Sequence, residues 1–146
     1  MEKNVCIDIK STQFANEERD VTELFTFGRL RRGRGKNKNK YKIIYEESQA
    51  TGYEGSTVTL DIDGSSMVTM ARTGDALSNL VIEKGKKHHC HYGTPFGDFI
   101  VGVKADEIRS EIDDNGGNLY LKYTVDINSS YMSETEMYVN VKEINQ

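Results

Sequence analysis

Hydrophobic and polar residues alternate with a period of two through much of this sequence, most clearly near its middle. Residues 41–47, 57–62 and 67–72 each place a set of apolar side chains on one face. This alternation is typical of β-strands, because successive side chains of a strand point to opposite sides. The dipeptide Asp63-Gly64 between the second and third runs favours a tight hairpin turn. The middle of the sequence therefore predicts three consecutive antiparallel strands.

Other runs extend this pattern on both sides. We expect further strands over residues 4–10, 21–30, 77–83, 88–92, 98–104, 119–127 and 131–142. Apolar residues fall on both faces of the run 21–30, so the sequence leaves open which face is buried. The two sets are Val21, Phe25 and Phe27 on one side and Leu24 and Leu30 on the other.

Several segments depart from the alternation. Residues 13–20 are polar and are expected to form a loop, and residues 31–39 form a connection longer than a minimal hairpin needs. Residues 105–114 fit one face of a helix as well as one face of a strand, and their alternating charges favour the strand. Turns are expected around Pro95 and at residues 115–117 and 128–130.

These elements indicate the fold class. Eight to ten short strands without a convincing amphipathic helix predict an all-β protein. Sequential hairpins favour a single antiparallel up-and-down β-barrel, formed as one domain by residues 1–146. Its expected core contains Val5, Ile7, Ile43, Val58, Leu60, Ile62, Met70, Leu121, Tyr123, Val125 and Val139.

Composition narrows the class of protein. The 146 residues suit one domain, and 36% hydrophobic with 29% charged residues is ordinary for a soluble globular protein. No membrane span or secretory signal is apparent, so we expect a cytoplasmic protein with no membrane partner. Cys6 and Cys90 are far apart and outside any CxxC motif, which predicts free thiols.

Five segments resemble a known family in the order in which they occur. They are YKIIYEES, TGYEGSTVTL, ARTG, YGTPFG and GGNLYLKYTVDIN. Together they are similar to the YwiB-like bacterial family, a domain of unknown function with a calycin-type, lipocalin-like β-barrel. The resemblance implies the barrel fold, and it supplies no activity, cofactor or catalytic residue. Secreted lipocalins carry a Gly-x-Trp motif in the first strand, whereas this sequence has no tryptophan.

Two of the predicted interior faces end in a charged residue. Glu47 continues the face of Tyr45, and Arg72 continues the face of Met70. A buried charge is costly unless it is paired and hydrogen-bonded, and Arg72 suits the carboxylate of Glu47 or of a ligand. Two readings stay open: an internal or rim ion pair, and a ligand-binding site. In the second reading the candidate site residues are Tyr45, Glu47, Arg72, Tyr92 and Tyr123.

A second candidate site is a basic segment. Residues 29–42 hold eight basic residues and no acidic one, while the rest of the chain carries all 23 acidic residues. Arg31, Arg32, Arg34 and Lys36 are the candidate contacts for nucleic acid or another polyanion. No aromatic residue lies between Arg29 and Lys40, so the base-stacking component of single-strand binding is missing. We therefore expect little nucleic-acid binding.

Metal and catalytic signatures are weaker. Residues 88–91 read His-His-Cys-His, but on a strand only alternate members share a face, and two ligands do not make a zinc site. Nucleophile-elbow, phosphate-loop and HExxH motifs are absent from the sequence. The sequence favours a non-enzymatic barrel, without cofactor or metal, that binds a small apolar or acidic ligand in or at the mouth of the barrel. The alternatives are polyanion binding and a protein-interaction scaffold, as a monomer or a homodimer.

Overall fold

Ten antiparallel strands close into a barrel in a computed structural model of the protein, which describes residues 1–37, 39–48, 54–74, 77–94, 97–127 and 130–144. The strands are β1 (Glu2–Ala15), β2 (Glu18–Arg32), β3 (Lys40–Glu46), β4 (Thr57–Asp63), β5 (Met67–Thr73), β6 (Ser78–Glu83), β7 (Lys87–Thr94), β8 (Gly97–Asp113), β9 (Gly116–Ile127) and β10 (Ser130–Glu143). A short 3-10 helix, η1 (Gly35–Asn37), lies between β2 and β3. Each strand pairs with its neighbours in the chain, and β1 pairs with β10. The predicted all-β, up-and-down barrel is confirmed.

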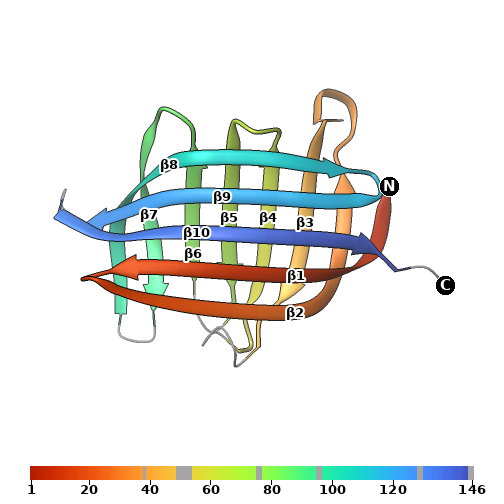
Figure 1. The fold of residues 1–146 in the computed structure, drawn as a ribbon. Coiled ribbons are helices and arrows are strands. Elements are labelled where there is room, and N and C mark those ends of the chain that lie inside the picture. The colour runs from red at the N-terminus through yellow and green to blue at the C-terminus, as the bar shows by residue number, and fades with distance from the viewer. Residues whose placement is uncertain (38, 49–53, 75–76, 95–96, 128–129, 145–146) are drawn as a thin grey trace.

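The barrel is built from two layers whose strands cross at a steep angle. In Figure 1, the long strands β8, β9, β10, β1 and β2 run across the front, and β3 to β7 run behind them. Strands β2 and β8 each take part in both layers. The end of β2, residues 28–32, pairs with β3 of the rear layer. The start of β8, residues 97–104, pairs with β7 of the rear layer, and from residue 102 onward β8 pairs with β9 of the front layer. Residues 18–27 of β2 consequently pair with β1 alone among the described strands.

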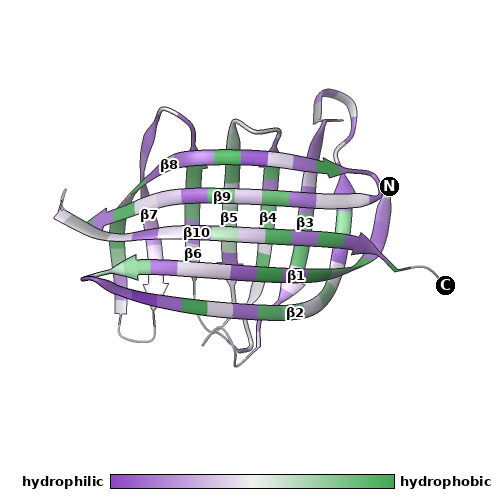
Figure 2. Cartoon of the chain, viewed as in Figure 1, coloured by the Kyte–Doolittle hydropathy of each residue, from purple (hydrophilic) through white to green (hydrophobic). Residues whose placement is uncertain are grey.

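Alternation along the strands builds the core. Figure 2 shows hydrophobic and hydrophilic residues following each other along strands of both layers. Every residue that the sequence placed in the core is buried, with at most 6% of its surface exposed. The ambiguous run in β2 is also resolved, because Leu24 and Leu30 are buried, whereas Phe25 and Phe27 are 59% and 63% exposed.

The loop predicted over residues 13–20 is wrong. β1 continues to Ala15 and β2 begins at Glu18, so the turn consists of Asn16 and Glu17, both with positive φ. Two residues with positive φ form the kind of short hairpin turn that matches strand twist. The polar residues on either side remain in strands because they pair across the hairpin, as Phe14 does with Arg19.

Other boundaries agree more closely with the prediction. Residues 105–113 belong to strand β8, as their charges favoured, with an irregularity between Ala105 and Glu107. The hairpin at Asp63-Gly64 is present, although Asp63 pairs with Met67 and three residues form the loop. The turns expected at Pro95 and at Asn128-Ser129 lie outside the described residues. Both cysteines are free, as predicted.

Among the residues that the structure describes, no helix has the length and apolar character that a membrane crossing requires.

Candidate ligand-binding site

A cavity of about 170 Å³ opens at the end of the barrel where β3 and β5 finish. All of the residues proposed from the sequence as ligand contacts line it: Tyr45, Glu47, Arg72, Tyr92 and Tyr123. They come from β3, β5, β7 and β9 and from the residue just after β3. The structure thus brings together residues that are up to 78 positions apart in the sequence.

The cavity has an apolar part and a polar part. Its apolar lining is Ile9, Leu24, Met70, Leu80 and Met137, and its uncharged polar lining includes Ser11, Gln13, Thr22 and Thr135. The sequence analysis missed the four polar residues. Their signal was strand parity, because Ser11 and Gln13 continue the inward face of Ile9, and Thr135 continues that of Met137. For Ser11 and Gln13 the parity was lost because the first strand was expected to end at residue 10, whereas Thr22 and Thr135 lie inside the expected strands 21–30 and 131–142.

Glu47 and Arg72 form a buried, bidentate ion pair in the wall of the cavity. The Arg72 Nε donates to Glu47 Oε2 at 2.8 Å, and Nη2 donates to Oε1 at 3.0 Å. The exposed fractions of the two side chains are 4% for Glu47 and 11% for Arg72. Strand pairing positions the pair, since the Glu47 amide donates to the Ser56 carbonyl and Arg72 lies opposite Val58 on β4. The internal ion pair that the sequence left open is therefore present, inside the cavity.

Tyr45 presents a polar atom to the same cavity. Its side chain is buried on β3, with 4% of its surface exposed. No hydrogen bond joins its hydroxyl to another residue in the described part of the chain. Burial raises the pKa of Tyr45 above the usual tyrosine value, and the nearby Glu47 carboxylate adds to this effect. Tyr45 is therefore a neutral hydrogen-bond donor at any ordinary pH.

A half-exposed aromatic residue lies opposite one of the cavity residues. Phe99 pairs with Tyr92 across β7 and β8, on the same face as the buried Val101, yet it is 42% exposed. Thr22 and Leu24 border the cavity from the half of β2 that pairs only with β1.

The basic segment lies at the opposite end of the barrel, and much of its charge is compensated. The Arg31 Nη2 lies 2.7 Å from the Glu2 carboxylate, and Arg32 lies 3.0 Å from Asp114. Arg34 and Lys36 are exposed between β2 and β3. A wider hollow of about 450 Å³ beside this segment is lined by basic and acidic residues together. Lys40 and Lys42 in its lining pair with Asp63 and Asp61. The structure does not gather these basic side chains into an uncompensated patch.

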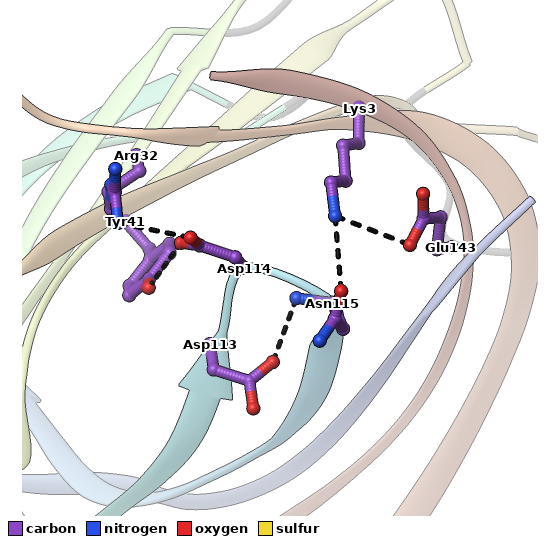
Figure 3. Close-up of polar contacts among 7 residues, drawn as sticks. All are labelled: Lys3, Arg32, Tyr41, Asp113, Asp114, Asn115 and Glu143. Carbon is purple, nitrogen blue, oxygen red and sulfur yellow. Dashed lines mark hydrogen bonds and ion pairs between the residues drawn. The ribbon is translucent and has the colours of Figure 1, made fainter.

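A polar network joins elements at this opposite end. Asp114, in the turn between β8 and β9, accepts hydrogen bonds from Arg32 and from the Tyr41 hydroxyl, the latter at 2.8 Å (Figure 3). Burial and the Asp114 carboxylate raise the pKa of Tyr41 above its usual value. In the same view Lys3 donates to Asn115 and pairs with Glu143 of β10. The β8–β9 turn is thereby tied to the first, second, third and last strands.

The histidine cluster is dispersed across both faces of β7. The His88 Nε2 lies 2.8 Å from Glu83, His91 lies 3.5 Å from Asp98, and Cys90 is buried. Among the described residues, no three histidine, cysteine, aspartate or glutamate side chains are placed to hold a metal ion.

Comparisons with known proteins agree with this architecture. The crystal structure of the ywiB protein from Bacillus subtilis superimposes with a TM-score of 0.81 at 17% sequence identity, covering 99% of this chain and 94% of that one. At this identity the likeness shows the fold alone. No curated protein matches the chain in sequence. The model of the family described as Domain of unknown function (DUF1934) matches residues 7–139. This match covers most of the sequence, which confirms the YwiB-like resemblance, and the protein belongs to the DUF1934 family.

Proposed function

We propose that the barrel binds one small, mainly apolar molecule whose single polar group lies against Tyr45 and the Glu47–Arg72 pair. The observation that carries this proposal is Tyr45, whose side chain is buried, lines the cavity and has no hydrogen-bond partner for its hydroxyl among the described residues. A ligand group that accepts a hydrogen bond from this hydroxyl should gain about 1 kcal/mol net.

The size of the cavity limits the ligand. Drug-sized molecules occupy pockets of about 300 to 1,000 Å³, whereas an apolar cavity of about 150 Å³ holds a single benzene ring. The cavity of about 170 Å³ therefore accommodates one ring or a short branched chain. A longer molecule would leave its remainder in the mouth, beside Phe99.

The ion pair limits the polar group. Arg72 already donates two hydrogen bonds to Glu47, so a ligand carboxylate would approach a carboxylate that is in place. Like charges at short range disfavour ionisation of both groups. An uncharged acceptor such as a hydroxyl, carbonyl or amide fits best, and an acidic ligand has to displace Glu47 or bind protonated. Such binding without chemistry is the role we assign to this barrel, and the opening of the cavity at one end of the barrel supports it.

Matched aromatic probes test the proposal. Toluene, benzyl alcohol and benzoate would be titrated into the labelled protein, with dissociation constants taken from NMR shifts of the lining residues. Benzyl alcohol should bind about fivefold more tightly than toluene, since one hydrogen bond contributes about 1 kcal/mol. Benzoate should bind more weakly than benzyl alcohol at neutral pH.

Two tyrosine variants provide the controls. Tyr45→Phe removes the hydroxyl without changing the ring and should abolish the preference for benzyl alcohol. Tyr41→Phe changes the same strand at the other end of the barrel and should leave it unchanged. If none of the probes shifts the lining residues, the proposal is wrong. Tighter binding of benzoate would point instead to an acidic ligand.

A further inference from the structure

Among the described residues, the first half of β2 presents a backbone edge without a strand partner. The Gly33 amide donates to Lys40 of β3, and the Arg32 amide donates to Met1 on the side of β1. Neighbouring residues of a strand direct their amides to opposite sides, so odd-numbered residues of β2 face the β3 side. β3 pairs only with residues 28–32, and no described strand pairs with residues 18–27 on that side. In Figure 1 this segment lies along the lower border of the front layer.

Apolar side chains gather on the outer face of this same segment. Val21, Phe25 and Phe27 are 44%, 59% and 63% exposed, and the two phenylalanine rings meet edge to face at 5.4 Å. Natural proteins usually protect open edges, and an apolar edge strand is a template for pairing with another chain. The segment therefore combines unpaired backbone with uncovered apolar surface.

Charges on this face are arranged for a second copy of the strand. Arg19 and Glu23 make no ion pair within the described residues, whereas Arg29 and Arg31 of the same strand both pair with Glu2. Arg19, Val21, Glu23, Phe25 and Phe27 all lie on the outer face, in that order. The segment thus carries an unpaired base near one end, an unpaired acid in the middle and two aromatic rings at the other end.

We propose that the protein forms a two-fold symmetric dimer in which residues 18–26 of β2 pair antiparallel with the same residues of a second copy. An axis at Thr22 places Thr22 opposite Thr22, Arg19 opposite Phe25, and Val21 opposite Glu23. Diagonal neighbours on a sheet are also within reach of long side chains, so each Arg19 meets Glu23 and Phe27 of the other copy. Shifting the axis to Glu23 would place two carboxylates face to face, which selects the register at Thr22.

The dimer extends beyond the proposed ligand function, because it brings a second copy to the mouth of the cavity. Thr22 lines that cavity. Paired residues of antiparallel strands project to the same face, so Thr22 of the second copy lies next to the cavity as well. Each protomer would then contribute to the border of its neighbour's site.

Charge reversal tests the pairing. The dimer dissociation constant of the full chain would be measured by analytical ultracentrifugation. Arg19→Glu places an acid against Glu23 in two symmetric positions, and we expect about a tenfold weaker dimer from the lost and reversed cross-strand pairs. The double variant Arg19→Glu/Glu23→Arg exchanges the charges and should restore the dimer, which a merely misfolded variant would not do.

A symmetric cross-link tests the register. Thr22 of one copy should lie about 4.5 Å from Thr22 of the other between Cα atoms, which is within the range of a disulfide. In a Cys6→Ser background, Thr22→Cys should form an intermolecular disulfide under mild oxidation. Thr26→Cys is the matched control, because two Thr26 residues would lie about 26 Å apart along the strands and should stay reduced.

The outcomes separate the proposal from its alternatives. A concentration-dependent dimer, the charge-exchange rescue and selective cross-linking of Thr22→Cys together support it. A protein that stays monomeric at high concentration overturns it and leaves the edge for a strand of another protein. A dimer that is insensitive to Arg19→Glu and to Thr22→Cys overturns it as well, since another surface then forms the contact.

Discussion

At the scale of single residues, the buried Glu47–Arg72 pair decides what the cavity can hold. Arg72→Met would leave the Glu47 carboxylate buried without its two hydrogen bonds. Breaking a buried ion pair on one side costs about 3 to 5 kcal/mol, so we expect a loss of this size in the free energy of unfolding. Urea denaturation measures it.

The double variant Glu47→Leu/Arg72→Met removes both charges together. It should recover most of the stability, because replacing both partners by apolar residues is often neutral. Equal destabilisation by the single and double variants would show that the pair contributes through packing rather than charge.

Tyrosine residues give the protein a predicted weakness at high pH. Burial raises the pKa of Tyr41, Tyr45 and Tyr120, and Tyr120 also donates to Glu136 at 2.6 Å. In the unfolded chain a tyrosine ionises near pH 10. Above this pH the unfolded state loses protons that the folded state keeps, so stability should be complete below about pH 10 and decline as the pH rises further.

Unfolding in urea at pH 8 and pH 11 measures this decline. Tyr45→Phe should reduce it, because this substitution removes one of the buried hydroxyls. Absorbance at 295 nm should show that some of the eight tyrosines ionise later than the others. Synchronous ionisation of all tyrosines in the folded protein would contradict the prediction.

Strand parity explains how much of the site the sequence could predict. Period-two alternation placed Tyr45, Glu47 and Arg72 on inward faces, and the structure places all three in the cavity lining. Alternation shows that Arg72 and Glu47 point inward, but it does not show whether they are close enough to form an ion pair. That distance depends on how β3, β4 and β5 pair with one another. The same limit applies to Ser11 and Thr135, whose polar side chains interrupt the apolar pattern near the mouth.

At the scale of elements, Gly28 allows β2 to pass from one layer to the other. A Cβ atom at this position would lie 2.2 Å from the Ile44 carbonyl oxygen and 2.8 Å from Ile7 Cδ1. Gly28→Ala should therefore force the β2–β3 pairing apart and cost about 3 kcal/mol, as overpacking of a tight core does. Thermal unfolding with chemical denaturation at 25 °C measures the change.

Gly64→Ala is the matched control. Gly64 has open space around its Cβ direction but a positive φ, so the substitution should cost only about 1 kcal/mol. A similar loss for both variants would mean that strand β2 adjusts at Gly28 without strain.

The lengths of the strands were harder to predict than their number. β1 and β2 extend through residues whose polar character predicted a loop, because polar side chains can lie at the barrel mouth and on the outer face. β8 was foreseen in two pieces because its irregularity at Ala105 and Glu107 interrupts the alternation. The β8 error lies beside the residues that pair with both layers, whereas the missed parts of β1 and β2 lie at their hairpin within the front layer.

At the scale of the whole molecule, the distribution of charge argues against a polyanion site. Arg31 and Arg32 are paired with Glu2 and Asp114, and acidic residues dominate outside residues 29–42. We expect no saturable binding of a single-stranded oligonucleotide at 150 mM salt, as measured by fluorescence anisotropy, because counterion release needs several free cationic contacts.

The paired acids offer a control for that experiment. Glu2→Gln/Asp114→Asn frees both arginines and should strengthen any weak binding seen at low salt. Changing Arg31, Arg32, Arg34 and Lys36 to Ser should have little effect on binding. Tight, salt-sensitive binding by the unmodified protein that this fourfold change removes would contradict the prediction.

The pairing of β1 with β10 has a consequence for how the protein is made. Val5 lies opposite Glu143, so the contacts that close the barrel join positions 138 residues apart in the chain. During synthesis β1 emerges early, and one of its two edges has no partner until the last strand has left the ribosome. Contacts of such long range form slowly, and an unpaired edge is prone to association while it waits. The nascent chain should therefore depend on chaperones most strongly until β10 has been made and has paired with β1.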